Sequence, residues 1–146
     1  FPWEPETGQF FTLVYGILDV RENAFHYVSA GHPPLIHITE TGAHELPASE
    51  GLPIGLSHKP YQEQCVILQP GERLVIYSDG VSESMNSQGE LFGTTRLLNL
   101  LTRHRALSLN DSLDHVFDAL AEWHGEQRFN DDISIVALGR TPGNPA

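Results

Sequence analysis

The sequence predicts an α+β fold, in which a run of strands is followed by two neighbouring helices and a final strand. Residues 10–78 are dominated by short segments rich in β-branched and aromatic side chains. Two segments with apolar residues at helical spacing then follow together, at residues 95–104 and 109–124. Helices that are grouped after strands, instead of alternating with them, favour α+β over a parallel doubly wound sheet. With 146 residues, the chain is long enough for one domain with a hydrophobic core.

Six segments have the composition and turn signals of strands: residues 10–18, 24–29, 35–39, 64–68, 74–78 and 133–138. The first two form a hairpin whose turn ends at Asn23, a residue suited to a left-handed backbone. The prolines at residues 33–34 give a rigid, kinked connection to the third strand. The turn at residues 69–71 is expected to pair the fourth strand antiparallel with the fifth.

Two helices are predicted in the second half of the chain. In the first, Leu97, Leu98 and Leu101 form an apolar face. Ser108 is expected to cap the second, with Asp111 three residues on. The buried stripe of that helix is expected to contain Leu109, Leu113, Val116, Phe117 and Leu120. A polar loop is expected between the fifth strand and the first helix, at residues 81–89.

Acidic residues stand at the ends of two apolar strands. Asp79 and Gly80 follow the strand at 74–78, and Asp131 and Asp132 precede the last strand. An Asp-Gly pair at a strand end most often caps a turn, and that reading stays open. If the two strand ends meet, however, the carboxylates repel one another unless a cation joins them. Oxygen ligands select Mg²⁺ or Mn²⁺, and a pair of such ions can hydrolyse a phosphoryl group.

Composition excludes several other functions. The net charge of −11, from 8 basic and 19 acidic residues, argues against nucleic-acid binding and against contact with an anionic membrane. Cys65 is the single cysteine, so no internal disulfide forms and a cytoplasmic setting is expected. No His-Glu-x-x-His frame is present, and His32 is expected to shape the Gly-His-Pro-Pro turn. No apolar run reaches membrane-spanning length, and the first residue, Phe1, suggests a piece of a longer protein.

Six ordered motifs resemble one family, the bacterial type 2C metal-dependent serine/threonine phosphatases of the stage II sporulation protein E branch. They are Ser-Ala-Gly-His-Pro-Pro (29–34), Gly-Leu-Pro-Ile-Gly-Leu (51–56), Leu-Gln-Pro-Gly-Glu (68–72), Tyr-Ser-Asp-Gly-Val-Ser-Glu (77–83), Gly-Glu-Leu-Phe-Gly (89–93) and Asp-Asp-Ile-Ser (131–134). The resemblance implies an α-β-β-α sandwich of antiparallel sheets flanked by helices, with a two-metal centre. By position, Asp79 and Asp131 resemble catalytic metal ligands, and Asp132 resembles a neighbouring ligand or cap. The resemblance places the phosphatase domain at residues 10–139, after an N-terminal arm (1–9) and before a tail (140–146).

The resemblance also implies a substrate class and partners. Members of this branch dephosphorylate phosphoserine or phosphothreonine proteins, commonly anti-sigma-factor antagonists, and carry N-terminal regulatory or sensor domains. The polar loop at residues 81–88 is the candidate substrate contact, because it lies beside Asp79.

One departure from the family pattern is large. The first acidic motif, Gly-Asp-x-x-Gly-His-Gly, supplies the bridging aspartate and has no counterpart in this sequence. The N-terminal part of the domain is therefore expected to be missing, which leaves this fragment inactive and its sheet edges open to self-association. The alternative is a non-catalytic domain of the same fold that binds a protein or transmits a signal.

Overall fold

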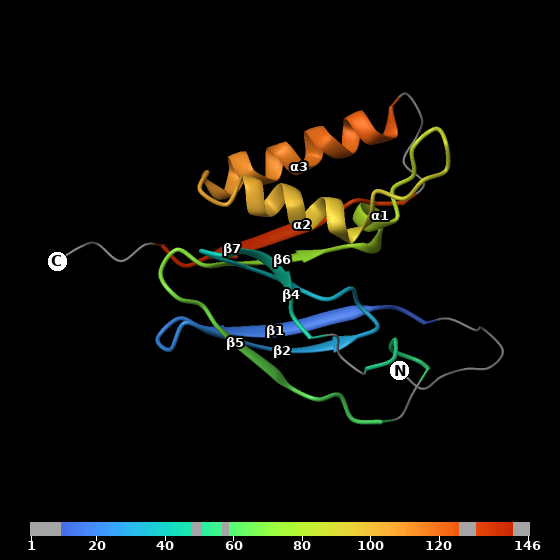
Figure 1. Ribbon diagram of the computed structural model, residues 1–146. Coiled ribbons are helices and arrows are strands. Elements are labelled where there is room, and N and C mark those ends of the chain that lie inside the picture. The colour runs from blue at the N-terminus through green and yellow to red at the C-terminus, as the bar shows by residue number, and fades with distance from the viewer. Residues whose placement is uncertain (1–9, 48–50, 57–58, 126–130, 142–146) are drawn as a thin grey trace. The chain divides into compact units, whose positions relative to one another are not determined.

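The computed structural model describes residues 10–47, 51–56, 59–125 and 131–141, and the elements there confirm the α+β prediction. The strands form two antiparallel sheets, one of three strands and one of four (Figure 1). The chain divides into two compact units, each built around one sheet. The three helices belong to the unit that holds the four-stranded sheet.

The first unit contains the three-stranded sheet, in the order β1-β2-β5. Its strands are β1 (Leu13–Asp19), β2 (Ala24–Ala30) and β5 (Gln64–Ile67). The hairpin of β1 and β2 is confirmed, and Asn23 in its turn has the expected left-handed backbone, with φ of 55°. Most side chains of β2 are buried, whereas those of β1 are exposed except for the half-buried Val14. The centre of this unit is therefore β2, with β1 as an edge strand.

Two of the sequence motifs contact each other beside this sheet. The backbone N–H of Gly31, in the Gly-His-Pro-Pro turn, donates a hydrogen bond of 2.7 Å to the carbonyl of Gly51. Gly31 has φ of 67°, and a Cβ atom there would lie 2.4 Å from the ring of Pro53. A side chain at residue 31 is therefore excluded both by backbone conformation and by contact. His32 donates from Nδ1 to the carbonyl of Pro33 at 2.9 Å, in keeping with a turn-shaping role.

The second unit contains the four-stranded sheet, in the order β4-β3-β6-β7. Its strands are β4 (Gly42–Glu45), β3 (Ile36–Thr39), β6 (Arg73–Tyr77) and β7 (Ile135–Gly139). The sequence did not predict β4, because its four residues carry no alternating apolar pattern. It is held instead by pairing with β3 and by the hydrogen bond from the Ala43 N–H to the Thr102 hydroxyl, at 2.9 Å.

Helices α2 (Gly93–Arg103) and α3 (Leu109–His124) cover one face of this sheet (Figure 1). The shared core is formed mainly by aliphatic side chains: Ile36, Ile38, Ala43, Val75, Tyr77, Val81, Phe92, Leu97, Leu101, Val116 and Leu120. The predicted cap is confirmed, since the Ser108 hydroxyl accepts from the Asp111 N–H at 3.1 Å. Phe117 was wrongly placed in the buried stripe and is 42% exposed. Ser112 and His124 occupy the buried face instead.

Two other local predictions are wrong. β5 does not pair with β6; it pairs with β2, and β6 pairs with β3 and β7. The turn at residues 69–71 therefore carries the chain from one sheet to the other. The expected loop at residues 81–89 begins within a helical turn, α1 (Asp79–Ser82), and Val81 is completely buried in the core. Among the described residues, no helix is both long and apolar enough to cross a lipid bilayer.

Candidate functional site: two acidic segments at one end of the four-stranded sheet

Asp79 is the first residue of α1, directly beyond the end of β6. The strand ends at Tyr77, and Ser78 in an extended conformation turns the chain into the helix. The turn is closed by a hydrogen bond from the Glu83 N–H to the Asp79 carbonyl, at 2.8 Å. Because β6 lies between β3 and β7 and is largely buried, the position of Asp79 is fixed by the core.

Asp131 and Asp132 reach the same end of the sheet from the other direction. β6 and β7 are antiparallel, with Tyr77 opposite Ile135, so the start of β7 lies beside the end of β6. Ser78 joins the two segments by three hydrogen bonds. Its N–H donates to the Ser134 carbonyl at 2.9 Å, and its hydroxyl donates to the Asp132 carbonyl at 3.0 Å. The same hydroxyl accepts from the Ser134 N–H at 3.0 Å.

Gly80 allows the two acidic segments to pack closely. A Cβ atom at this residue would lie 2.5 Å from the carbonyl oxygen of Asp132 and 3.5 Å from Cβ of Asp131. The first distance is shorter than any ordinary contact, so residue 80 must be glycine for this packing. The structure therefore brings the backbones of the two predicted acidic segments together.

The carboxylates of Asp79 and Asp131 are oriented by backbone N–H groups. The Gly80 N–H donates to Oδ1 of Asp79 at 3.0 Å, and the Asp132 N–H donates to Oδ1 of Asp131 at 2.8 Å. Each carboxylate is thus held through Oδ1, and these two backbone hydrogen bonds leave Oδ2 available. All three aspartates are exposed to solvent.

The donor chemistry at this end of the sheet fits a hard divalent cation, because it consists of solvent-accessible carboxylate oxygens. Within the described ranges, no three His, Cys, Asp or Glu side chains are grouped so that they could hold one metal ion. A hard divalent cation at this end of the sheet would therefore need water or another ligand to complete its coordination.

A short hairpin follows α1 and forms the candidate contact loop. Met85 and Leu91 are paired as an isolated antiparallel bridge, and both are exposed, at 40% and 47%. The Asn86 side chain closes the tip, because its Oδ1 accepts from the N–H groups of Gln88 and Glu90 at 3.0 and 2.9 Å. The candidate loop is therefore an ordered hairpin that carries apolar as well as polar side chains.

Sequence reasoning missed the roles of Ser78 and Gly80. The signal that could have found Ser78 is a small hydroxyl residue directly before the acidic turn, where it can bond to a neighbouring strand. The Asp-Gly pair was interpreted as a sharp backbone turn, but Gly80 serves close packing against residues 131–132.

Comparison with known sequences gives a family match over nearly the whole chain. Residues 4–141 match the family Stage II sporulation protein E (SpoIIE). The chain is 28% identical over 137 residues to Protein IcfG of Synechocystis sp., covering 92% of this chain and 21% of that protein. It is also 28% identical over 138 residues to phosphoserine phosphatase RsbU of Bacillus subtilis, covering 92% of this chain and 40% of RsbU.

Solved structures show the same fold. The SiaA-PP2C domain of Pseudomonas aeruginosa is similar with a TM-score of 0.74 and 26% identity, over 88% of this chain and 50% of that one. The RsbU and RsbW domains of Rv1364c from Mycobacterium tuberculosis are similar with a TM-score of 0.78 and 24% identity, over 92% of this chain and 37% of that one. The chain thus spans half or less of each of these relatives, and its α+β fold matches PP2C phosphatase structures. On the match over residues 4–141, the chain belongs to the stage II sporulation protein E family.

Proposed function

We propose that this chain supplies Asp79 and Asp131 as metal ligands to a Mg²⁺- or Mn²⁺-dependent protein serine/threonine phosphatase of the cytoplasm. The observation that carries the proposal is the packing of residues 131–132 against Gly80, since it places both acidic segments at one sheet end. The position of each aspartate within its motif, Ser-Asp-Gly and Asp-Asp-Ile-Ser, supports the same assignment.

Each residue has a distinct part in this proposal. Asp79 and Asp131 would hold the cation through the carboxylate oxygens that do not accept from the Gly80 and Asp132 N–H groups. Asp132 contributes its backbone, through its N–H to Asp131 and its carbonyl to Ser78. Ser78 keeps the two segments at a constant separation, so the ligands need little reorganisation when a cation binds.

A pair of bound cations would supply Lewis-acid activation of water and neutralise the phosphoryl oxygens. The residues of this chain provide anchoring carboxylates for that chemistry, but the sequence contains no Gly-Asp-x-x-Gly-His-Gly motif to bridge two ions. We therefore expect the chain by itself to bind a cation incompletely and to turn over phosphate esters poorly.

The proposed substrate is a phosphoserine or phosphothreonine protein, such as an anti-sigma-factor antagonist. Two relatives of this chain, RsbU and RsbP of Bacillus subtilis, are named phosphoserine phosphatases, which supports this class. The structure of Rv1364c joins an RsbU domain to an RsbW domain, which supports a signalling setting with further domains in the same chain.

A non-catalytic role of a domain with the same fold is the second candidate. In that case the domain would bind a protein or transmit a signal, without a need for the ligands. Close packing at Gly80 would then serve only the fold.

Phosphatase assays on two lengths of the protein test the proposal. We expect p-nitrophenyl phosphate turnover in Mn²⁺ to be weak for this chain and strong for the parent chain extended through the first acidic motif. Asp79→Asn in the extended chain should abolish turnover, whereas Asp118→Asn, on the exposed face of α3, should not. Strong turnover by the short chain would show that hydrolysis does not require the first acidic motif. No turnover by the extended chain would favour the non-catalytic role.

Metal binding is measured separately by thermal denaturation. Mn²⁺ at ten to a hundred times its Kd should stabilise the wild-type chain by about 1 to 3 kcal/mol. Asp79→Asn should lose most of this gain, and Asp118→Asn should retain it. An equal gain in all three proteins would show that the ion binds elsewhere on the acidic surface.

A further inference from the structure

A groove with a volume of about 510 Å³ lies between α2 and α3, outside the acidic site. Its apolar lining includes Leu100 on α2 and Ala119 and Trp123 on α3, and its polar lining includes Arg96 and Arg103 on α2. Cavities of this volume are typical of ligand sites in proteins. The two arginines are seven residues apart on one helix, so their Cα atoms are separated by about 10 Å along its axis.

Arg96 is held in a fixed position within this groove. Its guanidinium lies 4.0 Å from the centre of the Trp123 ring, which is the distance of a cation–π contact. Its Nη1 donates to the carbonyls of Leu91 and Phe92, at 3.1 and 2.9 Å. The other N–H groups of the guanidinium remain available to a ligand. Because the side chain is already fixed, a ligand that binds them would cost little additional side-chain entropy.

The groove is cationic on a chain that is otherwise strongly acidic. The net charge is −11, yet two of the 8 basic residues, Arg96 and Arg103, line this one groove. Among the described residues, neither groove arginine is paired with a carboxylate; the ion pairs of His26 with Glu63 and of His37 with Glu72 involve other residues. The charge of the groove is therefore complementary to an anionic ligand.

We infer that this groove docks an acidic segment of a partner protein, in which two carboxylates flank an apolar side chain. The carboxylates would meet Arg96 and Arg103, and the apolar side chain would contact Leu100, Ala119 and Trp123. Arginine and tryptophan are the residue types most enriched where protein interfaces gain their affinity. Two arginines two helical turns apart, with apolar lining near them, fit a peptide that carries two carboxylates better than a single small anion. This inference needs neither a bound metal nor phosphatase activity.

Peptide binding to the full chain tests the inference in the absence of metal. The probe is a short fluorescein-labelled peptide in which leucines alternate with pairs of glutamates, compared with a peptide that has glutamine at every glutamate. We expect the glutamate peptide to bind and its affinity to fall as salt is raised. In a Trp3→Phe background, Trp123 is the single tryptophan, and the unlabelled peptide should change its emission.

Arginine variants locate the binding site. Arg103→Gln should weaken binding of the glutamate peptide by about tenfold, and Arg103→Lys should recover part of the loss. The matched control is Arg105→Gln. Arg105 lies two residues away, donates to the carbonyls of Glu40 and Thr102, and does not line the groove. The control should bind like the wild type.

Three results would overturn the inference. Equal affinity for the glutamine peptide would show that charge is not recognised. An equal loss in Arg105→Gln would show that the peptide senses a general basic surface. A dimer in sedimentation equilibrium that Arg103→Gln, but not Arg105→Gln, converts to a monomer would show that the occupant is a second copy of the chain.

Discussion

His104 and His115 stack against each other where α2 leads into α3. Their ring centres are 4.0 Å apart and their planes differ by 19°. Desolvation in this half-buried position lowers the pKa of His104 from its ordinary value of 6.5, and the nearby positive charges of His115 and Arg103 lower it further. The folded protein therefore favours the neutral form of His104.

This pair makes stability dependent on pH. Because the folded-state pKa of His104 is lowered, the unfolded chain binds more protons below pH 6.5. The stabilisation is present above that pH and is lost as the pH falls through the folded-state pKa. We expect the melting temperature to drop between about pH 7.5 and about pH 5.5, and His104→Gln to reduce that drop. His44→Gln, at an exposed position on β4, is the control. If both variants reduce the drop in melting temperature equally, the pH dependence does not come from His104.

Among single residues, the sequence predicts where Asp79 and Asp131 stand, but it does not predict which residues hold their two segments together. Asp79 and Asp131 stand at the ends of apolar strands, which local composition reveals. The roles of Ser78 and Gly80 depend on a segment far away in the chain, since Ser78 bonds to Ser134 and Gly80 packs against Asp132. No local pattern encodes such a contact.

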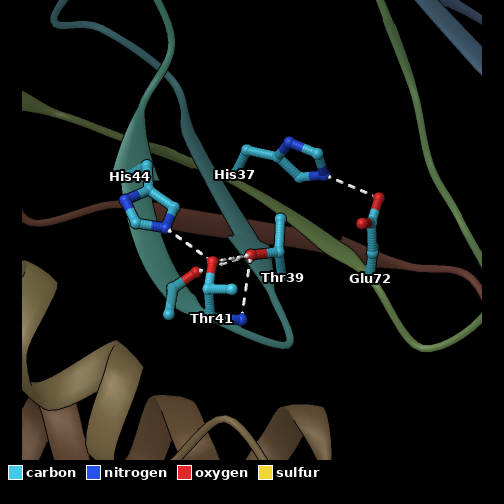
Figure 2. Close-up of polar contacts among 6 residues, drawn as sticks. His37, Thr39, Thr41, His44 and Glu72 are labelled. Carbon is cyan, nitrogen blue, oxygen red and sulfur yellow. Dashed lines mark hydrogen bonds and ion pairs between the residues drawn. The ribbon is translucent and has the colours of Figure 1, made fainter.

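At the scale of elements, a side-chain bridge joins β3 to the start of β6. His37 Nε2 lies 2.9 Å from Oε2 of Glu72, and the two side chains are only 19% and 17% exposed (Figure 2). On β4, Nε2 of His44 lies 3.2 Å from the hydroxyl of Thr41. Glu72 belongs to the Pro-Gly-Glu motif that precedes β6, so the bridge fixes the strand that delivers Asp79.

Removing one partner of this bridge should destabilise the second unit. Glu72→Gln retains the size of the side chain but loses its charge, and we expect a loss of about 1 to 2 kcal/mol in the free energy of unfolding, measured in urea. Glu63→Gln is the control, because its bond to His26 is exposed and should be worth less than about 1 kcal/mol. If both variants lose the same free energy, burial does not strengthen the bridge.

The elements themselves were largely predictable, and their partners were not. The two helices and six strands were recognised from periodicity and composition. The pairing of β5 with β6 was predicted because a Pro-Gly turn separates them, but that turn connects two sheets. Turn chemistry specifies where a strand ends, whereas the choice of partner depends on the whole core. β4 was missed because pairing with β3 outweighs its poor strand propensity.

For the molecule as a whole, β1 is the feature with the clearest consequence for association. It is an edge strand in the described sheet, and Tyr15 and Ile17 are 62% and 60% exposed. No charged residue lies between Leu13 and Leu18, and edges of this kind pair readily with other chains.

We therefore expect this chain to self-associate at high concentration through β1. Ile17→Lys should shift the protein toward the monomer in light scattering coupled to size-exclusion chromatography, because a charged side chain on an edge strand opposes pairing. Phe117→Lys, at an exposed apolar position on helix α3 (42%), is the control and should leave the distribution unchanged. Equal effects of the two variants would show that association depends on net charge and not on this edge.

The late position of β7 in the chain has a kinetic consequence. β7 pairs with β6, but α1, α2 and α3 lie between these two strands in the sequence. The contact between Tyr77 and Ile135 therefore joins residues that are far apart in the chain. Helices and contacts between neighbouring helices are local and form fast, whereas contacts between residues far apart in the sequence form more slowly. We therefore expect residues 131–132 to reach Gly80 late in folding, because this contact joins segments far apart in the sequence. A cation held between the two acidic segments would therefore find no site in the folding transition state, and would prolong the lifetime of the native state without accelerating its formation.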